Sequence, residues 1–155
     1  MKEAVTRALS GAIYITLLIL SLYWQHALAA LFFVFGIICL AEFKKLINLK
    51  DFYPFIIFTV LYFVFGYWST IITTTSGFDE AIQILHVITI FVQLFLIKDL
   101  FSEKTIPLFS SKRYLITTFY LSSAFVFLIL IANFKHEFTP LLLLGTFILI
   151  WINDT

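Results

Sequence analysis

The sequence predicts an all-α fold, a polytopic membrane protein with about six transmembrane helices. Of its 155 residues, 62% are hydrophobic and only 12% are charged, whereas an ordinary soluble domain has about 25% charged residues. The hydrophobic residues also fall into separate runs of roughly 20, the length that a helix needs to cross about 30 Å of hydrocarbon. Both observations argue against a water-soluble fold.

Six runs qualify as spans, and they cover residues 9–24, 26–43, 53–73, 81–97, 114–133 and 139–152. A tight turn at residues 23–25 joins the first two runs, which predicts a membrane hairpin. Pro54 and Pro140 lie next to the starts of the third and sixth runs. Proline suits the first turn of a helix, where its missing N–H costs nothing.

The distribution of lysine and arginine predicts how the spans are oriented. Nine of the ten basic residues lie before the first span or after the second and the fourth, and so on one side of the membrane. Lys135 lies on the other side, between the fifth and sixth spans. Because Lys and Arg accumulate on the cytoplasmic face, we expect a cytoplasmic N-terminus. An even number of spans then places the C-terminus on the cytoplasmic face as well.

The connection at residues 98–113 mixes basic and apolar residues around Pro107. It is predicted either to lie along the cytoplasmic interface or to be a solvated connector. The net charge of +1 and the lack of a long basic run give no indication of a nucleic-acid partner. Cys39 is the single cysteine, so neither a disulfide nor a cysteine metal site is expected within these residues.

Polar side chains inside the apolar runs need an explanation, because they are costly in hydrocarbon. His86 and Gln93 are seven residues apart in the fourth run, with Thr89 near the same helix face. They could line a polar cavity. We favour a structural interpretation, in which they hydrogen-bond to neighbouring helices, because no carboxylate accompanies them.

Two further features of the spans are interpreted structurally. Gly11, Gly36, Gly66 and Gly145 lie within the runs, where small residues permit close helix packing. Glu42 ends the second run just before two lysines. As a charge at a helix end near the interface, it requires no function.

The end of the sixth run has the most unusual composition, because polar residues close a run of Leu and Ile. Asp154 could bind a divalent cation through its carboxylate, with Asn153 or Thr155 adding neutral ligands, as in sites that hold magnesium with a phosphate substrate. The alternative is a helix-end aspartate that faces water. The sequence has no glycine-rich phosphate loop and no cluster of Arg and Lys beside carboxylates.

Three short segments, taken together, resemble the phosphatidate cytidylyltransferases, the bacterial CDP-diacylglycerol synthases. Residues 7–14 have an arginine followed by Ser-Gly at the head of the first span, similar to the opening of that family. Residues 41–46 resemble the acidic and aromatic step that ends the family's second span. Residues 151–155 resemble the start of its tryptophan and Asp-Thr motif. The order, spacing and predicted cytoplasmic side of the segments strengthen the resemblance.

The resemblance implies a reaction of phospholipid biosynthesis in a bacterial inner membrane. CTP and phosphatidic acid would give CDP-diacylglycerol and pyrophosphate, with Mg²⁺ assisting the transfer of CMP. The resemblance further implies that Asp154 is catalytic and binds the metal, with Asn153 and Thr155 as its substrate-binding neighbours. Arg7 and Ser10 are expected to contact a phosphate or the lipid headgroup.

The family's defining signature is absent from these residues, namely a serine followed by Lys-Arg, Lys-Asp, His-Gly-Gly and paired aspartates. Residues 1–155 are therefore expected to be the N-terminal transmembrane portion of a larger enzyme, inactive alone. One alternative is a small multi-span transporter or substrate-binding subunit, with His86 and Gln93 in its pocket. Another is a structural membrane subunit without a ligand. The sequence leaves open whether the protein forms a homodimer.

Overall fold

The computed structural model describes residues 2–46, 48–72, 78–101 and 107–153, and the regular elements within these ranges are all helices. This confirms the predicted all-α fold. The α-helices are α1 (Lys2–Ser21), α2 (Gln25–Leu46), α3 (Tyr53–Leu61), α4 (Phe78–Leu100), α5 (Pro107–Ala132) and α6 (Pro140–Asn153). A π-helix, η1 (Tyr62–Ile72), continues α3, and a short 3₁₀ helix, η2 (Phe134–His136), lies between α5 and α6.

Each predicted run corresponds to one of these helices, and the third run contains both α3 and η1. The change to a π-helix was not predicted. The hydroxyl of Thr70 donates a hydrogen bond to the carbonyl oxygen of Phe65, five residues back, at 2.8 Å. Five residues is the spacing of a π-helical turn, so this side chain stabilises a backbone form that hydrophobic periodicity does not reveal.

The described helices differ in how well their length suits a membrane. Residues 25–46 and 79–98 are each long and apolar enough to cross a bilayer. Four other apolar helical stretches, at residues 9–21, 53–68, 118–132 and 140–153, are shorter. In the connection at residues 98–113, the described parts are the end of α4 and the start of α5, and residues 102–106 lie outside the described ranges; its position relative to the membrane stays a prediction.

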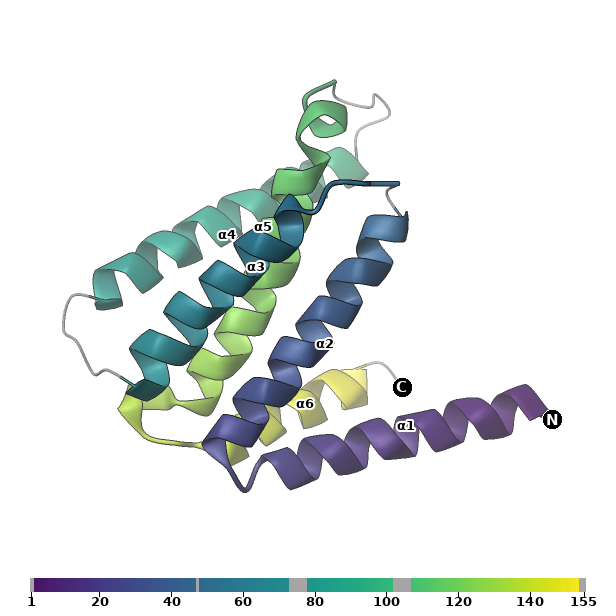
Figure 1. Cartoon of the computed structure of the whole chain (residues 1–155), viewed down its shortest axis with the longest axis vertical. Helices are drawn as coiled ribbons and strands as arrows, with labels where there is room; N and C mark the ends of the chain where they lie inside the picture. The colour runs from purple at the N-terminus through teal and green to yellow at the C-terminus, as the bar shows by residue number, and fades with distance from the viewer. Residues whose placement is uncertain (1, 47, 73–77, 102–106, 154–155) are drawn as a thin grey trace.

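Helix α5 is the centre of the bundle and contacts α2, α3, η1, α4 and α6. Figure 1 shows α3 and α5 side by side, with α4 on one flank and α2 on the other, whereas α1 and α6 run away from the base of the bundle at an angle. The most deeply buried apolar side chains come from several helices: Leu28, Phe32, Leu40, Phe58, Val126, Ile129 and Leu143. The core therefore lies along α5, and α1 remains at its margin.

One glycine allows the closest helix approach in this core. A Cβ atom at Gly36 in α2 would overlap the ring of Phe58 in α3. That ring is fully buried, stacks on Phe33 with 5.7 Å between centroids and meets Phe125 edge-on at 6.1 Å. The predicted packing role is confirmed for Gly36.

The other glycines in the spans are less constrained. A Cβ at Gly66 would make ordinary van der Waals contact, with its nearest atoms at 3.8 to 3.9 Å. For Gly11 and Gly145 a Cβ would meet no described atom within 4 Å. The packing prediction is therefore wrong for these two, because α1 and α6 do not approach another helix closely there.

Hydrogen bonds tie the two turns at the base of the bundle together. Gln25 Nε2 donates to Asn133 Oδ1 at 2.6 Å, and Asn133 Nδ2 donates to the carbonyl oxygen of Ile129 at 2.8 Å. The backbone N–H of Thr139 donates to the carbonyl oxygen of Ala132 at 2.7 Å. The α1–α2 turn and the start of α6 thus lie at the same end of the molecule.

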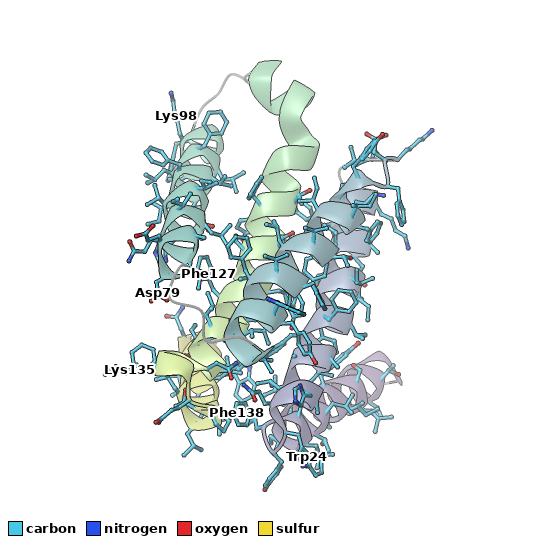
Figure 2. The ribbon with its side chains drawn as sticks, turned by 60° about the vertical axis from the view of Figure 1, so that its left-hand side comes forward. Trp24, Asp79, Lys98, Phe127, Lys135 and Phe138 are labelled. Atoms are coloured by element: carbon cyan, nitrogen blue, oxygen red, sulfur yellow. The ribbon has the colours of Figure 1, made fainter. Side chains whose placement is uncertain are left out.

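Helix α2 ends with a standard capping motif. Asn48 has a positive φ of 53°, and its N–H bonds the carbonyl oxygen of Lys45 at 3.2 Å. The N–H of Leu49 bonds the carbonyl oxygen of Lys44 at 2.9 Å, which completes a Schellman motif. Because this cap lies beyond residue 43, α2 continues past its predicted end. In Figure 2, Lys98 lies at the opposite end of the molecule from Trp24, Lys135 and Phe138.

Candidate functional site

A cavity of about 630 Å³ lies between α1, α2, α5 and α6. Helix α2 lines it with residues 32, 35, 38, 39 and 42, which recur at helical spacing and so share one face. Residues 11, 14, 15 and 18 of α1 and residues 125, 128, 147 and 151 of α5 and α6 complete the wall. The cavity therefore lies where α1 and α6 diverge from the bundle (Figure 1).

All three sequence segments contribute residues to the lining of the cavity. Gly11, Glu42 and Trp151 belong to segments 7–14, 41–46 and 151–155, and all three line the cavity. Two or more residues of each helix line the cavity. On its own helix, each of these three is the lining residue that is farthest in sequence from the turn at the base. Because those turns lie together, we assign Gly11, Glu42 and Trp151 to the mouth of the cavity, away from the base.

The floor and the walls are apolar and largely aromatic. Leu18 and Phe32 lie nearest the α1–α2 turn and are buried. Phe32 packs against Phe147 of α6 with 6.2 Å between ring centroids. Tyr14 of α1 meets Phe35 of α2 edge-on at 5.7 Å. These ring contacts connect the diverging helices across the cavity.

Glu42 is the one carboxylate among the described residues that line the cavity. Cys39 lies one helical turn before it on the same face of α2, and both side chains are exposed. The sequence interpretation of Glu42 as an ordinary helix-end charge missed this position. Its spacing from Phe35 and Cys39 was a usable signal, since residues seven and three apart share a helix face.

Of the five predicted site residues, the structure describes the side chains of Ser10 and Asn153 alone. Ser10 precedes Gly11, and Asn153 ends α6; both are exposed, and neither lines the cavity. Arg7 lies on α1, and its side chain is outside the described part of the structure. Asp154 and Thr155 lie outside the described residues. Their predicted roles stay predictions.

The described residues offer few ligands for a metal ion. Among them, no group of three or more His, Cys, Asp or Glu side chains could hold a metal ion. Glu42 supplies a single carboxylate at the mouth, and Mg²⁺ is usually bound by one or two carboxylates together with waters and substrate phosphates. The described residues that line the cavity thus offer one such carboxylate, and the predicted ligand Asp154 lies outside the described residues.

The polar pair on α4 does not form a pocket. His86 and Gln93 are exposed, and neither lines the cavity. The ring of His86 lies edge-on to Phe127, 5.2 Å between centroids, on the side of α5 that faces α4 (Figure 2). The hydroxyl of Thr89 bonds the carbonyl oxygen of Leu85 in its own helix at 2.7 Å. His86 therefore makes an apolar contact in place of the expected interhelical hydrogen bond.

The fold and the site define a class, a helical-bundle protein with an apolar cavity whose mouth carries a carboxylate. The model of the cytidylyltransferase family matches residues 5–155. The chain belongs to this family, the family of the phosphatidate cytidylyltransferases, which confirms the resemblance of the three segments. Membership implies CTP-dependent nucleotidyl transfer. Searches of curated proteins and of solved structures gave no significant match.

Proposed function

We propose that this protein is a membrane-bound phosphatidate cytidylyltransferase, which makes CDP-diacylglycerol and pyrophosphate from CTP and phosphatidic acid. The main support is the cavity mouth, where one residue of each family-like segment lies, on a chain that matches the cytidylyltransferase family. In this reaction a phosphate oxygen of the lipid bonds to the α-phosphorus of CTP. The bond from that phosphorus to the oxygen leading to the β-phosphate breaks, and pyrophosphate leaves.

The proposed site lies at the mouth of the cavity and includes the residues of the two chain ends. Asp154 is proposed as the catalytic and metal-binding carboxylate, with Asn153 and Thr155 as neighbouring substrate contacts. Arg7 and Ser10 are proposed to contact phosphate. Two anionic substrates must approach each other, so the site requires positive charge, which Mg²⁺ would supply by neutralising phosphate oxygens.

We also propose that the helices span a bacterial inner membrane six times, with both ends of this chain on the cytoplasmic face. Large apolar side chains are exposed on several helices, including Leu9 of α1, Phe91 of α4 and Leu149 of α6, which are 63%, 68% and 70% exposed. Many exposed large apolar side chains of this kind favour a protein surface that lipid or another protein covers. The separation of Lys98 from Trp24 in Figure 2 agrees with the predicted charge asymmetry.

The test is a cytidylyltransferase assay in membranes with labelled CTP and phosphatidic acid. It compares the protein from its complete reading frame with its Asp154→Asn variant and with residues 1–155 alone. We expect activity in the first and loss in the other two. Asp79→Asn is the matched control, because Asp79 is an exposed aspartate in the first turn of α4, at a helix end outside the cavity. It is expected to keep full activity.

Two results would contradict the proposal. If the complete protein inserts correctly and forms no CDP-diacylglycerol, the enzyme assignment is wrong, and a transporter becomes the leading interpretation. If Asp154→Asn keeps full activity, the assigned role of Asp154 is wrong and the reaction stands. Activity of residues 1–155 alone would contradict the expected dependence on further sequence.

A further inference from the structure

We infer that the cavity between α1, α2, α5 and α6 holds an acyl chain of the lipid substrate and excludes the nucleotide. The inference rests on the proposed function and specifies which substrate this cavity takes. It predicts that CTP binds outside the cavity, beyond its mouth, and that the floor residues select the length of the lipid chain.

The cavity has the polarity and the depth of one amphiphilic chain. Glu42 and Trp151 line the end that we assign as its mouth, and Leu18 and Phe32 line the end nearest the α1–α2 turn, which we call its floor. Phe32 and Glu42 are ten residues apart on α2, which is about 15 Å along a helix that rises 1.5 Å per residue. Half of the hydrocarbon thickness of a bilayer is also about 15 Å. A chain that enters at the mouth would therefore reach the floor at the depth of one leaflet.

The lining does not suit a nucleotide. A triphosphate requires cationic groups or backbone N–H donors, whereas the one charged side chain among the described residues that line this cavity is the carboxylate of Glu42. A cytosine ring requires hydrogen-bond partners, because its polar edge is costly to bury without them. The inner wall instead presents Phe32, Phe125, Leu128 and Phe147.

The cavity is also open toward the side where lipid would lie. Tyr14 and Ile15 of α1 are 56% and 44% exposed, and Ile38 of α2 is 47% exposed, although all three line the cavity. The side chains along this flank are thus only partly covered by protein. A lipid chain could slide in from the bilayer between these helices without leaving hydrocarbon.

Cys39 provides a probe of occupancy that does not depend on catalysis. It is exposed and lines the cavity one turn below Glu42. The protein from its complete reading frame is alkylated in detergent, and modification of Cys39 is followed by peptide mass spectrometry. A Cys39→Ser variant confirms the assignment of the modified peptide. The reaction is repeated with long-chain diacylglycerol, with long-chain phosphatidic acid, with glycerol phosphate and with CTP.

Both lipids are expected to slow alkylation, by about tenfold when the lipid is present at ten times its Kd. Glycerol phosphate and CTP are expected to leave the rate unchanged. Protection by CTP alone, or no protection by either lipid, would overturn the inference. Protection by diacylglycerol in a protein without cytidylyltransferase activity would support the cavity assignment and contradict the proposed function, so the two failures are distinguishable.

A substitution at the floor tests selection of chain length. Leu18→Phe enlarges a floor side chain, and Leu17→Phe makes the same change at an exposed position of α1 that does not line the cavity. Leu18→Phe is expected to lower kcat/KM for a long-chain phosphatidic acid relative to a short-chain one by about tenfold. Leu17→Phe is expected to leave that ratio unchanged. Equal ratios in both variants, with Cys39 still protected by lipid, would overturn the assignment of the floor.

Discussion

The two sides of the α2 helix face very different surroundings. Toward α3, Gly36 admits the ring of Phe58 so closely that a methyl group would not fit. Toward α1, the face with Phe35, Cys39 and Glu42 borders a cavity of about 630 Å³. Both sides are rich in aromatic rings, so composition does not separate them. The difference indicates that one face of α2 is packed for stability, whereas the other borders the cavity that we propose for a ligand.

The largest expected effect concerns the packed face. Phe58→Ala removes a fully buried ring that contacts rings of α2 and α5, and is expected to destabilise the protein by about 3 kcal/mol or more. Phe147→Ala removes a half-buried ring beside an existing cavity, so less packing is lost. Thermal unfolding in detergent measures both. Equal losses of stability would contradict the distinction between the two faces.

A smaller effect is expected for adding one methyl group. Gly36→Ala forces the clamped ring of Phe58 to move and is expected to cost about 1–3 kcal/mol. Gly145→Ala meets open space on α6 and is expected to stabilise the helix by up to about 1 kcal/mol, because alanine favours a helix more than glycine does. The two variants carry the same chemical change. If the melting temperatures of the two variants change by the same amount and in the same direction, the inference of tight packing at Gly36 is wrong.

Removing the negative charge of Glu42 tests the role of the face of α2 that borders the cavity. Glu42→Gln keeps the shape of the side chain and removes the negative charge at the mouth. If this charge holds a cation that the anionic substrates require, kcat/KM for cytidylyl transfer falls by about tenfold, equivalent to about 1.4 kcal/mol. Glu80→Gln, at an exposed position in the first turn of α4, is expected to have no effect on transfer. Unchanged transfer in Glu42→Gln would show that the carboxylate has no part in the reaction.

The positions of the helices could be predicted from the sequence, because runs of apolar residues are a local property of the chain. Two local features could not be predicted in the same way: the π-helix, within which the Thr70 hydroxyl bonds the carbonyl oxygen of Phe65, and the end of α2, where Asn48 has a left-handed backbone. Neither changes the apolar pattern. Helix existence was therefore predictable, whereas helix form and exact ends were not.

The candidate site was predictable only in part. Each of the three segments contributes to the lining of the cavity, through Gly11, Glu42 and Trp151 among others, and the roles predicted for individual site residues stay predictions. The selection of individual residues within them depended on which helix faces meet, and that is set by the angle at which α1 and α6 leave the bundle. For this reason Glu42 was taken as a plain surface charge and Gly11 as a packing residue. Asp154 lies outside the described residues, so its role is tested by the assay alone.

The smallest expected effect concerns the hydrogen bond at the base of the bundle, which joins the α1–α2 turn to the turn that follows α5. Gln25→Ala removes the hydrogen bond from its side chain to Asn133 across the two turns. An interhelical hydrogen bond of this kind in a membrane protein contributes about 0.6 kcal/mol on average, so the melting temperature should fall only slightly. A double-mutant cycle with Asn133→Ala isolates the pair, because Asn133 also bonds the carbonyl oxygen of Ile129. A coupling energy near zero would mean that the turns are held by packing, and that the angle of α1, and with it the cavity, does not depend on this bond.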